Sequence, residues 1–236
     1  MRIIEDRCIG CGRCVYICPV QAISLINGKA SIDLDLCVEC STCLRSAECP
    51  TNAIKFKHLK WPRLVRNPFS DVIATHKLTG IPGRGTEEMK TNDVTDRFQV
   101  GEVGFSIEVG RPGIGTRLAN IELFTTRLSQ IQVDWEPNSP ITALFEDDQG
   151  HINDEIKKER VLSVIIEFKI PLEKVPTVLE IIRHVETEID TVFSVGVVSR
   201  VMAGGNIPII DLLESEGFTI RPNAKVNLGL GRLPGR

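Results

Sequence analysis

The sequence has few aromatic residues, no long apolar run and no marked excess of charge. Aromatic side chains make up 5% of the 236 residues, so a core must be built mainly from Ile, Val and Leu. No segment reaches the roughly 18 uninterrupted apolar residues that a membrane-spanning helix needs, and the first residues lack the apolar core of a signal peptide. A net charge of −3 gives no reason to expect binding to nucleic acid or to a membrane surface. These absences predict a cytoplasmic protein.

Motifs of several common enzyme classes are also missing. There is neither a Walker A loop nor a G-x-G-x-x-G fingerprint, so no nucleotide, flavin or nicotinamide site is predicted. The histidines His58, His76, His151 and His184 are scattered without metal-ligand spacing, and only His76 lies beside a polar loop. Cysteine is absent after Cys49, which leaves no thiol there for nucleophilic catalysis. All eight cysteines must therefore serve one local purpose.

The eight cysteines form two runs of nearly equal spacing. The first run is Cys8, Cys11, Cys14 and Cys18, and the second is Cys37, Cys40, Cys43 and Cys49. The last cysteine of each run is followed by a proline. Three thiolates separated by two residues can bind three corners of one iron–sulfur cube, while the fourth cysteine, beside the proline, reaches the other cube. The spacing therefore predicts two ligand sets, which are Cys8, Cys11, Cys14 and Cys49 for one [4Fe–4S] cluster and Cys37, Cys40, Cys43 and Cys18 for the other.

The two runs belong to an internal repeat. CIGCGRCVYICPVQAI matches CVECSTCLRSAECPTNAI, and Asp6 and Asp35 each stand two residues before the first cysteine of their run. Between the halves, Asn27-Gly28 suits the two positive-φ positions of a type I′ turn and predicts a β-hairpin. With these features, residues 1–57 resemble the bacterial two-cluster ferredoxin family. The resemblance implies a two-cluster ferredoxin domain that transfers electrons.

The second cysteine run departs from the family pattern in the length of the gap before its last cysteine. Five residues separate Cys43 from Cys49 where the first run has three, which lengthens a loop but removes no ligand.

Zinc sites usually take two separated C-x-x-C pairs, which triplets do not provide. A disulfide framework needs an oxidising compartment, which nothing in the sequence indicates. We expect two low-potential [4Fe–4S] clusters, and their oxygen lability indicates an anaerobic host.

The charge of the first domain bears on what covers it. Residues 1–58 hold seven Lys and Arg against six Asp and Glu. Freely diffusing ferredoxins of this family are usually acidic, so the near-neutral balance predicts that faces of this domain are covered by the rest of the chain or by a fixed partner.

Residues 58–97 form a connector without a sustained helical or strand period. Its apolar residues predict that it wraps one domain onto the other; they are Trp61, Leu64, Val65, Phe69, Val72, Ile73 and Leu78. The polar stretch 83–93 supplies the candidate catalytic residues Arg84, Glu87, Glu88 and Lys90, because a glycine-flanked Arg can bind a carboxylate or phosphate and the others can move protons. The alternative is a solvated polar loop.

A second glycine-rich loop runs from Gly110 to Arg117. We expect it to link a strand to a helix, where free amides and the helix dipole favour an anion. The candidate anion-binding residues are Arg111, Gly113, Gly115, Thr116 and Arg117, and Thr116 is also a candidate helix cap. Together with Arg84, Lys90 and Arg97, this loop predicts a site for an anionic small molecule between the domains.

Residues 98–236 show a β-α-β pattern twice. Strands are predicted at 103–109, 131–135, 161–170 and 191–201, with helices near 116–131 and 176–189, an extra helix at 209–216 and a last strand at 218–226. This order predicts an α+β protein whose C-terminal domain is a ferredoxin-like split βαβ sandwich. Its 20 Asp and Glu against 14 Lys and Arg speak against nucleic acid. Fold alone does not assign its role.

Three functions are compatible with these features. The favoured one is an electron-transfer protein that delivers low-potential electrons to a redox partner, with the C-terminal domain docking a partner enzyme or forming a homo-oligomer. The second is a self-contained reductase whose anionic substrate binds the Arg- and Gly-rich loops next to the clusters. The third is a redox or metabolite sensor.

Overall fold

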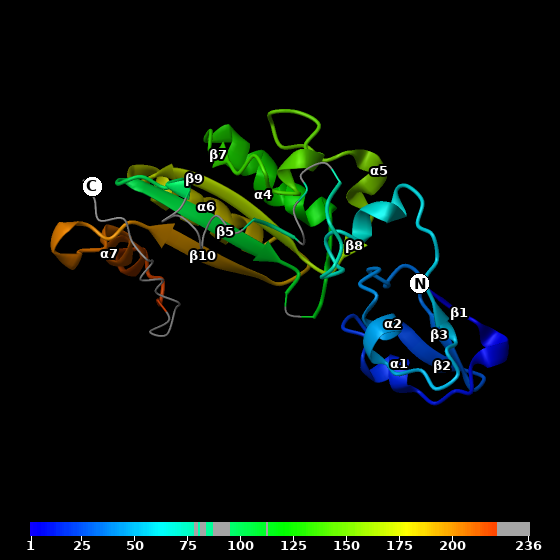
Figure 1. Ribbon diagram of the computed structural model, residues 1–236. Coiled ribbons are helices and arrows are strands. Elements are labelled where there is room, and N and C mark those ends of the chain that lie inside the picture. The colour runs from blue at the N-terminus through cyan, green and yellow to red at the C-terminus, as the bar shows by residue number, and fades with distance from the viewer. Residues whose placement is uncertain (78–79, 81–83, 87–94, 112, 221–236) are drawn as a thin grey trace.

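The computed structural model has a small cysteine-rich unit and a larger unit built on one sheet, joined by the connector (Figure 1). The structure describes residues 1–77, 80, 84–86, 95–111 and 113–220. Within these ranges, no helix is both long enough and apolar enough to cross a membrane.

The cysteine-rich unit, residues 1–55, consists of short elements around a small core. Its helices and strands are β1 (Arg2–Ile3), α1 (Arg13–Tyr16), β2 (Ile23–Ile26), β3 (Lys29–Ile32), α2 (Thr42–Ser46) and β4 (Ile54–Lys55). Strand β1 pairs with β4, and β2 pairs with β3, both antiparallel. Asn27 and Gly28 have φ values of 50° and 73°, which confirms the hairpin turn predicted from the sequence.

The sheet unit, residues 102–215, has four antiparallel strands in the order β10-β5-β9-β7. Their bounds are β5 (Glu102–Val109), β7 (Asp134–Trp135), β9 (Val164–Pro171) and β10 (Phe193–Ser199). Helix α4 (Ala119–Gln130) follows β5, and α6 (Val175–Glu186) follows β9. The elements therefore run in the twice-repeated β-α-β order that the sequence predicts.

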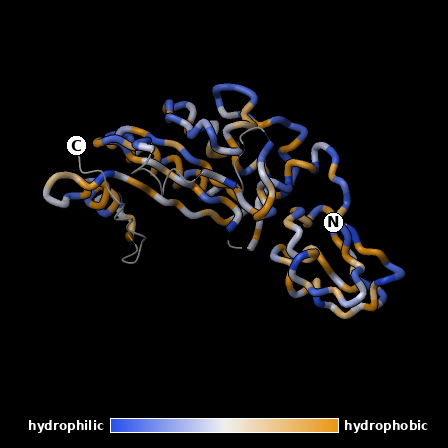
Figure 2. Tube along the Cα trace, in the orientation of Figure 1, coloured by the Kyte–Doolittle hydropathy of each residue, from blue (hydrophilic) through white to orange (hydrophobic). Residues whose placement is uncertain are grey.

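Alternating residues of β5 explain where the core lies. Val103, Phe105, Ile107 and Val109 are fully buried and belong to one hydrophobic cluster with the apolar stripes of α4 and α6. Side chains two residues apart share one face of a strand, so the strand covers the core with one face while Ser106 and Glu108 lie on the other. Figure 2 shows hydrophobic residues concentrated on these strands and hydrophilic ones on the outer loops.

The predicted strand at residues 161–170 is wrong in one respect, because it is two strands. Strand β8 (Arg160–Val161) pairs with β6 (Thr116–Arg117), and β9 begins only at Val164. Between them, the amide of Leu162 donates to Ser70 Oγ at 2.9 Å and the amide of Ser163 donates to the Phe69 carbonyl at 3.4 Å. The connector thus takes the hydrogen bonds that a continuous strand would give to its neighbour.

Two further α-helices lie in the sheet unit. Helix α5 (Asp154–Lys157) lies in the polar segment before β8, where Asn153 caps it by accepting a hydrogen bond from the amide of Glu155. Helix α7 (Pro208–Ser215) corresponds to the predicted extra helix. The predicted last strand is absent at residues 218–220, and its remainder, 221–226, lies outside the described residues.

The connector is anchored by fewer apolar residues than the sequence predicts. Val65 and Phe69 are buried and join the core cluster of the sheet unit. The expectation of burial is wrong for the four residues that are 39–77% exposed, which are Trp61, Leu64, Val72 and Ile73, while Leu78 lies outside the described residues. Composition cannot distinguish these cases, because burial in an irregular segment depends on what the rest of the chain places beside it.

Candidate functional site

The eight cysteines surround two hollows in the cysteine-rich unit. The residues that line the first include Cys8, Cys11, Cys14 and Cys49, and those that line the second include Cys18, Cys37, Cys40 and Cys43. Each hollow combines three thiols of one run with the proline-flanked thiol of the other run. All eight thiols are free. Among the described residues, no group of three or more His, Cys, Asp or Glu is arranged to hold a single metal ion.

The backbone repeats its conformation around both hollows. Positive φ values occur at matching positions of the two halves, and the pairs are Gly10 and Glu39, Gly12 and Ser41, and Gln21 and Asn52. Gly12 and Ser41 are the N-caps of α1 and α2, which carry the third cysteine of each run. Left-handed backbone is disfavoured for residues with a Cβ, so its use in both halves reflects a shared geometry around the cysteines.

Gly10 is required for a second reason, a close approach between two loops. A Cβ atom at Gly10 would lie 2.1 Å from the carbonyl oxygen of Gly28, in the hairpin turn. At Gly12 the nearest atom would be a side-chain carbon of Tyr16, 3.8 Å away. The hairpin therefore packs directly on the first cysteine loop, and only glycine at position 10 permits it.

Backbone amides donate hydrogen bonds to three cysteine sulfurs. The donors are Ala30 to Cys8 Sγ at 3.3 Å, Ala22 to Cys18 Sγ at 3.2 Å, and Ala53 to Cys49 Sγ at 3.3 Å. Ala22 and Ala53 occupy equivalent places in the repeat, four residues after the proline-flanked cysteine. Amide donors stabilise negative charge on sulfur, which is one of the ways in which proteins set the potential of an iron–sulfur centre.

The thiols of each hollow perturb one another. Burial raises the pKa of Cys43 to about 12, and repulsion from the thiolates of Cys40, Cys37 and Cys18 adds to that increase. Burial also raises the pKa of Cys14, with repulsion from the other cysteines of its hollow. Four thiolates in one small space therefore need a positively charged centre to offset their charges, and thiolate sulfur is the donor that iron–sulfur clusters take.

Comparison with known proteins agrees with this donor set. The family model of the 4Fe-4S binding domain matches residues 1–24. An uncharacterized ferredoxin of Methanocaldococcus jannaschii is 42% identical over 66 residues, which cover 25% of this chain and 83% of that ferredoxin. The chain belongs to the 4Fe-4S ferredoxin family. This identification applies to its N-terminal ferredoxin domain, since no family model matches the C-terminal part.

Two components of larger enzymes are also similar to the ferredoxin domain. Pyruvate synthase subunit PorD of Methanothermobacter marburgensis is 38% identical over 56 residues, which cover 24% of this chain and 63% of that subunit. A subunit of the ion-translocating oxidoreductase complex of Methanosarcina acetivorans is 38% identical over 55 residues, which cover 23% of this chain and 20% of that subunit. No solved structure matches the chain. The protein is a ferredoxin-like iron–sulfur electron carrier, and it continues after the ferredoxin domain into a C-terminal part that no family model matches.

Three arginines that sequence reasoning missed bind the backbone around the second cysteine run. Arg63 Nη1 donates to the carbonyl of Leu34 at 2.7 Å, and Arg66 Nη1 donates to that of Cys37 at 2.6 Å. Arg45 Nη2 donates to the carbonyl of Cys40 at 2.7 Å. The guanidinium groups thus hold the loop that presents two of the four thiols. Their only sequence signal is the pair of arginines three residues apart in the connector.

Each of these arginines also pairs with a carboxylate. Arg63 lies 2.7 Å from Glu39, which is 2% exposed and also pairs with the amino group of Met1. Arg45 lies 2.9 Å from Asp71, and Arg66 pairs with Glu159 of the sheet unit. Burial raises the pKa of Asp71, but hydrogen bonds from Arg45 and Ser41 outweigh it and hold that pKa below its ordinary value. We call Arg45, Arg63 and Arg66 the arginine clamp.

The glycine-rich loop at residues 110–117 does not have the predicted geometry. It leads into β6, and α4 begins at Ala119 with Leu118 as N-cap and no side-chain cap. The hydroxyl of Thr116 donates to the Arg117 carbonyl instead of capping the helix. The prediction of a strand-to-helix turn is therefore wrong, because the pairing of β6 with β8 separates the loop from the helix.

This loop nevertheless lies against the ferredoxin domain. A Cβ atom at Gly113 would be 3.5 Å from the Pro19 carbonyl, and one at Gly115 would be 3.6 Å from the Val20 side chain. Pro19 and Val20 line the second hollow. Arg111 pairs with Glu108 at 3.1 Å, and Arg117 donates to the carbonyl of Lys158 at 2.9 Å. The loop thus contacts the wall of the site while both arginines are engaged within the chain.

The described part of the polar connector loop is bound to the sheet unit. Arg84 Nη1 donates to Glu108 at 2.6 Å and also to Ser163 Oγ. The amide and hydroxyl of Thr86 donate to the carboxylate of Glu167 at 2.7 and 2.9 Å. Burial raises the pKa of Glu167 despite these donors. The other candidate catalytic residues, Glu87, Glu88 and Lys90, lie outside the described residues.

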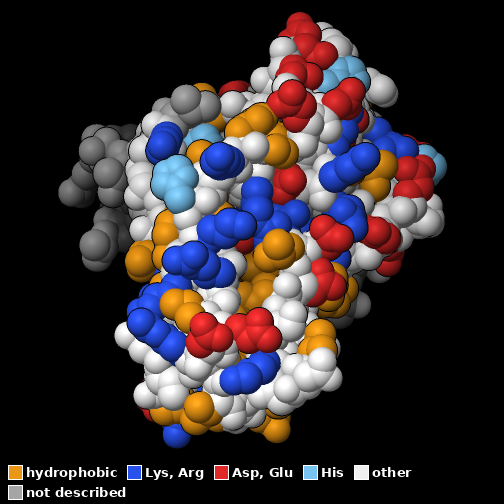
Figure 3. Space-filling model, turned by 90° about the vertical axis from the view of Figure 1, so that its right-hand side faces the viewer, with side chains coloured by type: hydrophobic (Ala, Val, Ile, Leu, Met, Phe, Trp, Pro, Cys, Tyr) orange, Lys and Arg blue, Asp and Glu red, His pale blue; other side chains and the backbone are white. Residues whose placement is uncertain are grey.

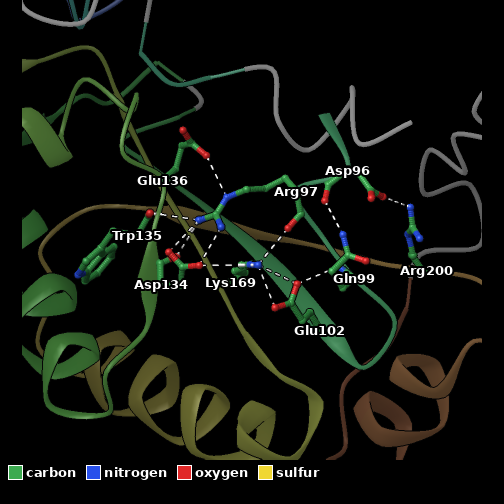
Figure 4. Close-up of polar contacts among 9 residues, drawn as sticks. All are labelled: Asp96, Arg97, Gln99, Glu102, Asp134, Trp135, Glu136, Lys169 and Arg200. Carbon is green, nitrogen blue, oxygen red and sulfur yellow. Dashed lines mark hydrogen bonds and ion pairs between the residues drawn. The ribbon is translucent and has the colours of Figure 1, made fainter. Parts of the chain in front are cut away.

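Arg97, the remaining candidate cation, belongs to an ion-pair network at the end of the connector (Figure 4). It lies 2.8 Å from Asp134 and 3.3 Å from Glu136, and Lys169 lies 2.8 Å from Glu102. The hydrogen bonds that Arg97 donates to Asp134 raise the pKa of Arg97. Because its guanidinium is bound by carboxylates, Arg97 fixes the connector to β7 and is not arranged to receive an anionic ligand.

Proposed function

We propose that the ferredoxin domain holds two [4Fe–4S] clusters and that the protein delivers low-potential electrons to a partner enzyme. One cluster is bound by Cys8, Cys11, Cys14 and Cys49, and the other by Cys37, Cys40, Cys43 and Cys18. The observation that carries the proposal is the crossed grouping of these cysteines around two hollows. When bound, such clusters take up and release single electrons.

The residues of the chain have separate tasks in this function. The thiolates bind the iron, and the amides of Ala22, Ala30 and Ala53 stabilise charge on sulfur. Buried apolar residues such as Ile23 and Ile54 exclude water. The arginine clamp holds the second cysteine loop against the connector, so that the geometry of that loop changes little when charge is added.

The similarity to subunits of oxidoreductases supports a protein partner. We divide the chain into a ferredoxin domain (1–57), a connector (58–97) and a C-terminal domain (98–236). The strand order β10-β5-β9-β7 supports a ferredoxin-like split βαβ sandwich for the C-terminal domain. Its role in this proposal is to dock the partner enzyme or a second copy of the chain, and a cytoplasmic location belongs to the same proposal.

The test is a measurement of cluster content and electron transfer on protein purified without oxygen. Two clusters predict about eight irons and eight sulfides per chain, measured by chemical analysis and by native mass. The reduced protein should then reduce a small viologen in a one-electron step. About four irons per chain, or none, would contradict the two-cluster proposal.

A reductase is the second candidate, because the glycine-rich loop lies against Pro19 and Val20 at the wall of the second hollow. Its anion-binding residues would be Arg111, Gly113, Gly115, Thr116 and Arg117, with Arg84, Glu87, Glu88 and Lys90 as catalytic residues. We expect Arg84→Ala to leave viologen reduction unchanged, since Arg84 is bound to Glu108 and Ser163. Loss of turnover of an anionic substrate by that variant, with intact cluster spectra, would favour the reductase.

A further inference from the structure

An open groove of about 540 Å³ crosses the outer face of the ferredoxin domain. The residues that line it come mainly from β1, β3 and the segments beside them, and they include the basic residues Arg2, Lys29 and Lys57. We call it the β1–β3 groove. None of the described residues that line it is a cysteine, so the groove is separate from both hollows.

Some of the residues that line this groove also line the two cluster sites. Ile3 and Ala30 line both the groove and the first hollow. Met1 and Ile32 are shared in the same way between the groove and the second hollow. Only one layer of side chains therefore separates a molecule in the groove from either site. Since electron tunnelling weakens steeply with distance, this face offers a short path to both.

The charge of the groove is locally opposite to that of the chain. The groove is lined by three cationic residues, Arg2, Lys29 and Lys57, and by one carboxylate, Glu5, whereas the whole chain has a net charge of −3. Lys29 donates to the carbonyl of Cys8, while neither Arg2 nor Lys57 has an ion-pair partner among the described residues. Figure 3 looks onto this end of the molecule, where Lys and Arg side chains gather in a band.

Exposed apolar side chains complete the surface. Ile26 and Leu34 line the groove and are 56% and 48% exposed. Apolar residues among cations, on an open surface, are typical of a protein interface, whereas small-molecule sites are more enclosed.

We propose that the β1–β3 groove docks an acidic protein partner that exchanges electrons with the ferredoxin domain. The proposal rests on the proposed function and names the surface that it uses. In each encounter the reduced protein loses one electron and the oxidised centre of the partner gains it, with no bond made or broken. The local cations attract the partner, and the apolar residues are covered when it docks.

Stopped-flow electron transfer to an oxidised acidic rubredoxin tests the groove, because rubredoxin takes one electron at a single iron. If only the net charge of −3 of this chain mattered, acidic rubredoxin would be repelled. The rate constant of electron transfer would then rise as salt screens the repulsion. Docking in the groove predicts the opposite, a rate constant that falls as ionic strength rises. A rate constant that rises with salt would overturn the proposal.

Two double variants separate the groove from the net charge. Arg2→Glu with Lys57→Glu reverses two groove cations, and Lys77→Glu with Lys158→Glu makes the same charge change at residues that do not line the groove. At low salt, the groove variant should be slowed at least about tenfold and the control about twofold or less. Equal slowing of both would contradict a specific docking site.

Reduction of a zwitterionic viologen, a small probe without net charge, separates this proposal from the proposed function. All three proteins should reduce it at equal rates, which shows intact clusters. If the wild type fails with the viologen, the electron-transfer function is wrong. If the viologen is reduced normally but rubredoxin shows no groove-dependent step, only the docking proposal is wrong.

Discussion

The guanidinium of Arg66 lies between the carbonyl oxygen of Cys37 and the carboxylate of Glu159. Its Nη1 is 2.6 Å from that carbonyl, its Nε donates to the carboxylate, and the residue is only 5% exposed. One side chain therefore joins the second cysteine loop to the sheet unit. A charge buried in this way depends on both partners.

Replacing Arg66 should loosen the junction between the two units. In Arg66→Met, Glu159 and the carbonyl of Cys37 lose their buried partner, which we expect to cost about 3 kcal/mol of unfolding free energy. Urea unfolding of the anaerobic holoprotein measures it. The control is Arg13→Met, whose exposed pair with Glu48 at 3.9 Å should contribute less than about 0.5 kcal/mol. Equal losses in both variants would contradict the role of the clamp.

Gly10 and Gly12 form a matched pair for testing the contact between the hairpin and the first cysteine loop. Both have positive φ, but only a Cβ at Gly10 would collide with backbone, 2.1 Å from the Gly28 oxygen. Gly10→Ala should therefore lose the first cluster, about four irons per chain, while Gly12→Ala keeps both. Iron analysis and cluster absorbance measure this, and equal iron loss in the two variants would exclude the contact as the cause.

Paired cysteine substitutions test the crossed ligand sets. Cys8→Ser and Cys49→Ser should damage the same cluster, because both residues line the first hollow. Their double variant should lose no more iron than one of them alone. Cys49→Ser combined with Cys37→Ser should lose both clusters, since Cys37 lines the second hollow. Electron paramagnetic resonance of the reduced proteins counts the remaining clusters, and the reverse pattern would contradict the assignment.

The carboxyl group of Glu167 should make stability depend on pH. Burial raises its pKa in the folded protein, with repulsion from Glu136 adding to the effect and the hydrogen bonds from the amide and hydroxyl of Thr86 opposing it. Below the ordinary pKa of Glu, this carboxyl group is protonated in both the folded and the unfolded protein, so it does not lower the free energy of unfolding. As pH rises through the folded pKa, ionisation costs more in the folded state and stability falls. Lowering the pH through that range restores it.

The variant Glu167→Gln removes this titration and keeps a side chain of the same shape. Its unfolding free energy minus that of the wild type should increase as pH rises from about 5 to about 8, measured by urea unfolding under anaerobic conditions. Glu180→Gln, at an exposed carboxylate of α6, is the control and should show no such trend. A difference that stays constant or decreases with pH would contradict the assignment to Glu167.

Local patterns were sufficient for several features of the fold. The Asn27-Gly28 turn was predictable because positive φ at two successive positions is a property of those residues. The alternation of Val103, Phe105 and Ile107 predicted β5 because the period of a strand is independent of its partners. The stripe of Val178, Ile182 and Val185 predicted α6 and its buried face in the same way.

Features that depend on contacts between distant segments were not predictable. The break between β8 and β9 arises because Phe69 and Ser70 bind the amides of Ser163 and Leu162, which are far away in sequence. Thr116 does not cap α4 because β6 pairs with β8 first. The local sequence does not show that residues 69–70 lie beside residues 162–163, or that β8 lies beside Thr116. Local propensity therefore predicted one continuous strand and a helix cap, and both predictions are wrong.

The spacing of the cysteines was sufficient to assign them to the clusters, because a cluster-binding loop is short and its ligands lie a few residues apart. How this loop is held, and from which surface it is reached, depends on the folded chain. Arg66 finds Cys37 and Glu159, and Arg2 and Lys57 come to one groove, through folding that brings remote segments together. The physical reason is that a buried charge or a surface patch is defined by what surrounds it in space, and spacing along the chain does not specify those neighbours.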